Sequence, residues 1–172
     1  LALMKTFFDV LIYITCIVSA VYLAIALKRF PSQVAKIDLK DNIKNKPPQK
    51  FLENSLVFIE FKTALPCVGF FAIALISYFC GSAPRDFANI NGTLIIPLLF
   101  ILVAAMFAGG MLLGNYFFKV AQKYNVYEKT NDPITARTRS GGQLGMGVLT
   151  TFYFSLTLLL TLIHLFYICG WL

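Results

Sequence analysis

The chain has 172 residues, of which 58% are hydrophobic and only 13% are charged. This composition belongs to membrane proteins, and one domain covering residues 1–172 is the natural division of the chain. The net charge of +7 would suggest a nucleic-acid partner in a soluble protein. Here the basic residues lie between apolar segments, where membrane topology and anionic lipid headgroups account for them, so we expect no nucleic-acid binding.

Four apolar segments follow one another along the chain, each long enough to cross a bilayer with about 30 Å of hydrocarbon. We expect membrane spans at about residues 10–27, 56–80, 93–118 and 144–171. The predicted fold class is therefore an all-α integral membrane protein, a four-transmembrane-helix bundle. The first segment resembles a signal peptide, but its stronger positive charge lies after it, on the wrong side, so we expect it to be retained.

Three polar connections separate these spans. Residues 28–50 are predicted to form a loop, because Pro31 and Pro47-Pro48 oppose a continuous helix. Residues 81–92 contain a formal glycosylation sequon, Asn91-Gly92-Thr93, which abuts the next helix and is expected to carry no glycan. The connections 28–50 and 119–140 together hold twelve of the 15 Lys and Arg residues. The positive-inside rule places both on the cytoplasmic, matrix or stromal side of a multi-pass protein.

Small residues crowd the segments on both sides of the connection at 119–140. Gly110 and Gly114 form one GxxxG pair, and Gly141 and Gly145 form another. Small residues let helix backbones approach closely in lipid, where packing rather than hydrophobicity drives association. These glycines are predicted to mediate helix packing, either with the chain's own helices or with another subunit.

Two polar residues inside the apolar segments stand out. Glu60 is costly in a membrane and usually needs a partner, although from the first turns of its helix it is also placed to reach the interface. His164 is the sole histidine and cannot supply bis-histidine haem ligation, so a hydrogen-bonded structural role is favoured. The four cysteines form no CxxC pair and lie in or beside apolar segments, so we expect no metal site.

Charged residues beside the two basic connections suggest an anion site. Arg137 and Arg139 open the fourth span, Lys119 ends the third, and Asn54 and Glu60 open the second. All lie on one membrane side in the predicted topology, where charge-assisted hydrogen bonds would hold a polar anion. The alternative is that these residues are ordinary anchors of the positive-inside kind.

This layout resembles the membrane-associated eicosanoid and glutathione metabolism superfamily (MAPEG), whose members are four-helix bundles that assemble as trimers. Asn54, Glu60 and Pro66 are similar to the opening of that family's second helix. The stretch GNYFFKVAQKY resembles the end of its third helix, with Asn115 where an Arg is expected, and the sequence from Arg137 resembles the start of its fourth. The resemblance implies glutathione binding, with Asn54, Glu60, Asn115 and Lys119 as ligand-binding candidates.

Two functions are in competition. The first is a non-catalytic integral membrane subunit, a MAPEG-like four-helix scaffold packing within a larger membrane protein complex, with no cofactor. The alternative is a glutathione-dependent transferase or isomerase acting on lipophilic substrates, in which Arg137 or Arg139 would stabilise a thiolate. The expected partners are membrane lipids and either other membrane subunits or two further copies in a homotrimer.

Overall fold

A computed structural model describes residues 1–39, 49–82, 92–124 and 133–171, and within them the side chains of 1–37, 53–82, 96–124 and 141–171. The described residues form four helices, α1 (Ala2–Leu39), α2 (Gln49–Cys80), α3 (Gly92–Lys123) and α4 (Pro133–Ile168), and no strand. All four are long and apolar enough to cross a membrane. The predicted all-α four-helix membrane fold is therefore confirmed.

The helices extend further than the predicted spans. The clearest difference is in α1, which continues through Lys28, Arg29 and Pro31 to Leu39, although a loop was predicted from residue 28. The side chains of Phe30 and Val34 are fully buried in a core cluster with residues of α2 and α3. This packing stabilises the helix across Pro31, where one backbone hydrogen bond is lost, because tertiary contacts contribute most of a helix's stability.

The connection predicted at 119–140 is also shorter than expected. Lys119 and Lys123 belong to α3, and residues 133–140 belong to α4, so only Tyr124 and the residues outside the described part separate the two helices. Prolines do mark the starts of two other helices. α2 begins directly after Pro47-Pro48, and α4 begins at Pro133, where the fixed φ of proline suits the first turn.

Glycines end α2 and α4. Gly170 has a φ of 71°, in the left-handed region that favours glycine. Its N–H donates to the carbonyl of Tyr167, and the N–H of Trp171 donates to the carbonyl of Phe166. This pair of bonds is a Schellman motif, which satisfies carbonyls that the end of α4 would otherwise expose.

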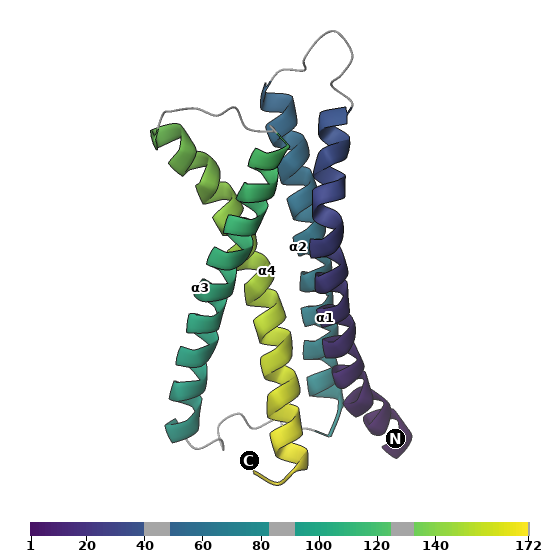
Figure 1. Cartoon of the computed structure of the whole chain (residues 1–172). Coiled ribbons are helices and arrows are strands. Elements are labelled where there is room, and N and C mark those ends of the chain that lie inside the picture. Colours follow the sequence, from purple (N-terminus) through teal and green to yellow (C-terminus); the bar gives the residue numbers. More distant parts are fainter. Residues whose placement is uncertain (40–48, 83–91, 125–132, 172) are drawn as a thin grey trace.

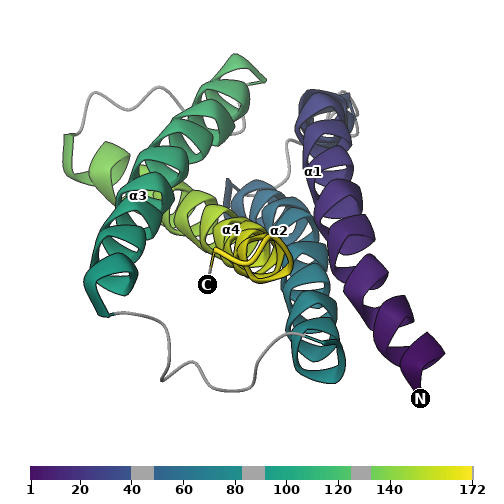
Figure 2. The same ribbon diagram turned by 90° about the horizontal axis from the view of Figure 1, so that it is seen from below.

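Figures 1 and 2 show α4 between α3 and α2, with α1 against α2 on the side away from α3. The ends of α1 and α3 and the starts of α2 and α4 all lie at one end of the bundle, which we call the loop end (Figure 1). Both chain termini lie at the other end, the terminal end. The predicted connections 28–50 and 119–140 therefore share one end, while their side of the membrane remains a prediction.

Two core clusters hold the helices together, one near each end. The cluster near the loop end joins α1, α2 and α3 through Phe30, Leu56 and Phe117. The cluster near the terminal end joins α1, α2 and α4 through Ile12, Ala74 and Leu160. Residues of α3 take part only in the first cluster, so the N-terminal part of α3 stands apart from the described core.

Glycines bring α3 and α4 into close contact where the two helices cross. A Cβ atom added to Gly110 would lie 2.7 Å from Cα of Val148, and one added to Gly114 would lie 2.7 Å from Cα of Leu144. The facing residue on α4 is Gly147, where an added Cβ would collide with the backbone of Gly110 and Gly114. The first predicted glycine pair thus packs against the chain's own helix.

The second predicted pair lies elsewhere. Gly141 and Gly145 are exposed, and a Cβ added at either would meet no atom within 4 Å. They are offset from Gly147 around α4, so they do not serve the crossing with α3.

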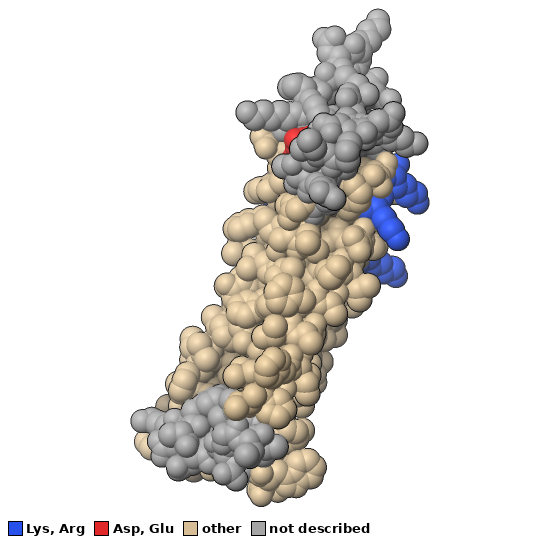
Figure 3. Space-filling model, turned by 90° about the vertical axis from the view of Figure 1, so that its left-hand side faces the viewer, with Lys and Arg blue, Asp and Glu red and all other residues tan. Residues whose placement is uncertain are grey.

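The outer surface is mostly apolar between the two ends. In Figure 3, which views the molecule from the α3 side, Lys and Arg side chains lie along one edge, from near the loop end to about mid-height. No charged side chain is visible on this face nearer the terminal end. A mostly apolar surface with basic residues toward one end is the distribution expected of a membrane-spanning protein.

The crossing predicts different results for a glycine of α3 that lies in it and a glycine of α4 that lies outside it. Gly114→Ala should lower the free energy of unfolding by roughly 1–3 kcal/mol, because the new methyl group overlaps the α4 backbone. Gly145→Ala adds the same methyl group in open space and should leave stability unchanged or slightly raised. Unfolding of the purified protein in mixed detergent micelles would measure both. Equal stability of the two variants would contradict the crossing.

Candidate functional site

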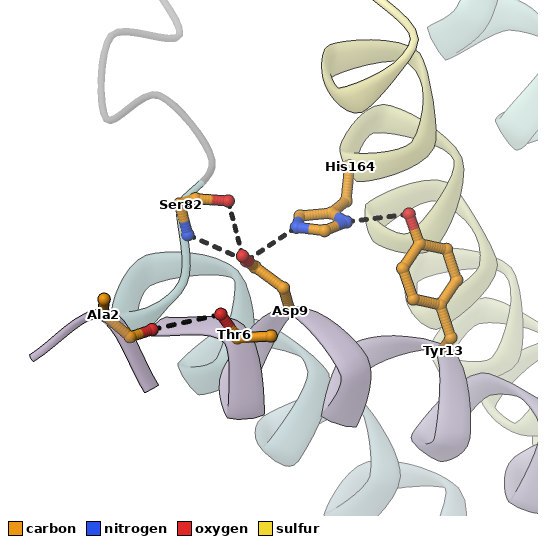
Figure 4. A network of polar contacts seen from close by, with 6 residues as sticks. All are labelled: Ala2, Thr6, Asp9, Tyr13, Ser82 and His164. Carbon is orange, nitrogen blue, oxygen red and sulfur yellow. Dashed lines mark hydrogen bonds and ion pairs between the residues drawn. The ribbon is translucent and has the colours of Figure 1, made fainter. Parts of the chain in front are cut away.

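A cluster of polar side chains ties three parts of the chain together at the terminal end. It consists of Asp9 and Tyr13 on α1, Ser82 just after α2, and His164 on α4 (Figure 4). The His164 side chain is fully buried, whereas 17% of the Asp9 side chain is exposed. The four residues are brought together from positions as far as 155 apart in the sequence.

Hydrogen bonding assigns a role to each group. The N–H of Ser82 donates to Oδ1 of Asp9 at 2.8 Å, and the Ser82 hydroxyl donates to Oδ2 at 2.5 Å. Nε2 of His164 lies 2.9 Å from Oδ1, and Nδ1 lies 2.9 Å from the Tyr13 hydroxyl. With Asp9 ionised, one consistent assignment has Nε2–H donating to the carboxylate and Nδ1 accepting from Tyr13. All polar atoms of the imidazole are then satisfied.

The local sequence allows this close approach. Asp9 and Tyr13 are four residues apart, so they lie on one face of α1. Gly81 precedes Ser82, and a Cβ at Gly81 would lie 3.0 Å from the carbonyl oxygen of Ser77 and closer still to the Asp9 carboxylate. Glycine at position 81 therefore leaves room for the Asp9 carboxylate to approach the end of α2.

The prediction that His164 is hydrogen-bonded is confirmed. The sequence reasoning missed its partners Asp9 and Tyr13, and it missed Ser82, which donates to Asp9. A signal was available, since an acidic residue at the edge of an apolar helix is costly unless it is paired. Because both ring nitrogens of His164 are engaged and its side chain is buried, the cluster is suited to fixing helices rather than to transferring protons from a substrate.

The predicted ligand-binding residues do not converge within the described chain. Asn54, Asn115 and Lys119 are exposed, whereas Glu60 is only 2% exposed. Asn115 and Lys119 are one turn apart on the outward face of α3. Arg137 and Arg139 lie in the first turns of α4, and their side chains are outside the described part.

Glu60 points into the bundle, so the expectation that it reaches the membrane interface is wrong. It lies on a buried stripe of α2 that also includes Leu56, Ala64 and Cys67, all at helical spacing. The angular position of Glu60 around α2, rather than its distance from the start of the helix, decides where the side chain points. Oε1 of Glu60 is buried and has no hydrogen-bond partner.

The remaining candidate chemistry is limited in the described residues. All four cysteines are free thiols. No group of three or more His, Cys, Asp or Glu side chains there could hold a metal ion. No protein-family model, curated protein or solved structure matches the chain. The resemblance to MAPEG proteins therefore stays a prediction.

The polar cluster predicts a specific loss of stability. Asp9→Asn replaces one of the two acceptor oxygens by an NH2 group and removes the negative charge, so at least one of the three hydrogen bonds that Ser82 and His164 donate loses its acceptor. We expect the free energy of unfolding to fall by about 1–3 kcal/mol. Thr6→Val is the control, because its hydroxyl is exposed and bonds only the Ala2 carbonyl of the same helix; it should change stability by less than about 0.5 kcal/mol. A loss in Thr6→Val as large as that in Asp9→Asn would show that the cluster adds nothing.

Proposed function

We propose that the protein is a non-catalytic membrane subunit, a four-helix scaffold that packs within a larger membrane protein complex. The observation that supports this most is the exposure of α3. None of the residues from 96 to 108 is buried. In the most apolar window of α3, 6% of the residues are buried inside the protein, against 33% in α2 and in α4.

A helix of a self-contained bundle buries one face against its neighbours. The N-terminal part of α3 instead diverges from α1 and α2 toward the terminal end (Figure 1). An open groove of about 210 Å³ lies along it, lined by Ile96, Leu99, Phe100 and Val103. An apolar helix that the rest of its own chain does not cover is typical of a helix whose neighbours lie outside the chain.

The composition of this segment suits a protein neighbour as well as lipid. Ala104, Ala105 and Ala108 are exposed and small. Small residues allow another helix to approach its backbone closely, which is the main source of helix association in lipid. Because Gly110 and Gly114 are already packed against α4, the surface we propose for assembly is residues 96–108, the α3 assembly surface.

Bulky substitutions on this surface should weaken assembly without unfolding the chain. Ala105→Leu and Ala108→Leu should each weaken association by about 1–3 kcal/mol, roughly five-fold to more than a hundred-fold, by analogy with overpacked cores. Ala72→Leu makes the same change at an exposed position of α2 and should have no effect. Native mass measurement after mild detergent extraction would report the assembly, and thermal unfolding would confirm that each variant is folded.

Two outcomes would contradict this proposal. One is a wild-type protein that migrates as a monomer. The other is an equal effect of all three alanine substitutions, which would mean that α3 has no special role.

The alternative enzyme is tested by glutathione binding. We expect calorimetry to detect none, because Asn115 stands where the resembling family has an arginine, and because the exposed Asn54, Asn115 and Lys119 do not meet the buried Glu60. Millimolar or tighter binding that is lost in Arg137→Ala or Arg139→Ala would instead support a glutathione-dependent transferase or isomerase. An inactive tripeptide without the thiol would serve as the control ligand.

A further inference from the structure

Glu60 is an acid well inside a candidate membrane span. The span begins at Glu53, so Glu60 lies about 10 Å further along α2 at a rise of about 1.5 Å per residue. Its side chain is 2% exposed, and Oε1 has no hydrogen-bond partner. The proposed scaffold function gives this carboxyl group no role.

The side chains next to Glu60 on the buried stripe of α2 offer it no free hydrogen-bond donor. On the buried stripe of α2, Leu56 and Ala64 are apolar. The hydroxyl of Thr63 donates to the carbonyl of Ile59, and the thiol of Cys67 donates to the carbonyl of Thr63. The two polar groups nearest along the stripe are therefore engaged with the α2 backbone.

The other helices bring no described charge to the site. The core cluster that contains Leu56 is completed by Phe30 and Val34 of α1 and by Phe117 of α3. On α4 the buried polar residue beside the crossing is Gln143, which is uncharged. The basic residues of this region whose side chains are described point outward: Lys28, Arg29, Lys62 and Lys119. None of them forms an ion pair with Glu60.

An ionised carboxylate in such a place is strongly disfavoured. Burial away from bulk solvent, with no described counter-charge beside it and with Oε1 unbonded, raises the free energy of the carboxylate above that of the neutral acid. The nearest exposed polar residue toward the loop end on α2 is Asn54, which lies less than two turns from Glu60 on the outer face of the helix. The buried carboxyl group is therefore favoured in its neutral form.

We propose that Glu60 is a proton-binding site inside the membrane, where the folded protein holds it as a neutral carboxylic acid. The site is independent of the assembly proposed above, because Glu60 is buried within the chain and the α3 assembly surface is not. Its ligand is the proton itself.

Infrared spectroscopy of the protein in lipid vesicles tests the protonation state directly. At neutral pH we expect a C=O stretching band of a protonated carboxylic acid that shifts when D2O replaces H2O. Glu60→Gln, which keeps the size of the neutral acid, should remove the band. Glu53→Gln, the same substitution about two turns nearer the loop end, should leave it.

An apolar carbodiimide provides a second, chemical readout. Dicyclohexylcarbodiimide takes the proton of a carboxylic acid onto one nitrogen while the carboxyl oxygen bonds to its central carbon. The acyl group then migrates to the other nitrogen as a stable N-acylurea. Peptide mass analysis should find this adduct on Glu60 and not on Asp9, whose carboxylate accepts hydrogen bonds from Ser82 and His164.

The opposite results would overturn the proposal. A carboxylate band that disappears in Glu60→Gln would mean that Glu60 is ionised, with Arg137 or Arg139 as its counter-charge. A wild-type protein without the acid band or without the Glu60 adduct would overturn it as well, even if Glu60→Gln fails to fold. Native mass measurement of Glu60→Gln separates the two proposals, since loss of the proton site should leave the assembly intact.

Discussion

The close crossing of α3 and α4 is the contact on which the position of α3 depends. Lipid tails are as apolar as leucine, so burial alone does not attract one helix to another in a membrane. Close backbone packing must supply the attraction, and Gly110, Gly114 and Gly147 permit it. The crossing also directs the C-terminal part of α3 toward α1, where Phe117 joins Phe30 in the loop-end core. If side chains held the helices apart here, α3 would lose its place in that core.

The two ends of the bundle are stabilised by different interactions. At the loop end, aromatic and aliphatic side chains pack around the glycine crossing. At the terminal end, Asp9, His164 and Tyr13 tie α1 to α4 by hydrogen bonds, and none of the α3 side chains that the structure describes takes part. The N-terminal part of α3 is thus beyond the reach of both. The exposure of this part of α3 follows from this arrangement. The same arrangement is the reason that the proposed α3 assembly surface lies there rather than at the glycines.

The sequence was a good guide to the number of helices and a poorer guide to their faces. Apolar length fixes the number of spans, because any helix crossing the bilayer needs about twenty apolar residues. Pro31 misled the prediction since the burial of Phe30 and Val34 outweighs one lost hydrogen bond. The GxxxG pattern of Gly110 and Gly114 indicated close packing. Its partner Gly147, however, lies on a buried stripe of α4 with Gln143 and Thr150, at spacings of four and three residues. The acid at the edge of the first apolar segment signals that Asp9 needs a partner, but contacts across 151 and 155 residues leave no local pattern that identifies His164 as that partner.

The interior of this bundle is as polar as it is apolar, which changes how its buried residues are satisfied. Among the described residues, twelve buried polar or charged side chains accompany thirteen buried hydrophobic ones, while large aliphatic and aromatic side chains cover the outside. Hydroxyl groups find acceptors locally: Thr150, Thr157 and Thr161 each donate to the carbonyl four residues earlier. A carboxylate cannot do this, since it only accepts hydrogen bonds and the helix interior presents carbonyls with no free N–H. The protonated acid does carry a donor. Glu60 can therefore follow the pattern of its neighbours only in its neutral form, which makes protonation a consequence of placing an acid in a helical membrane interior.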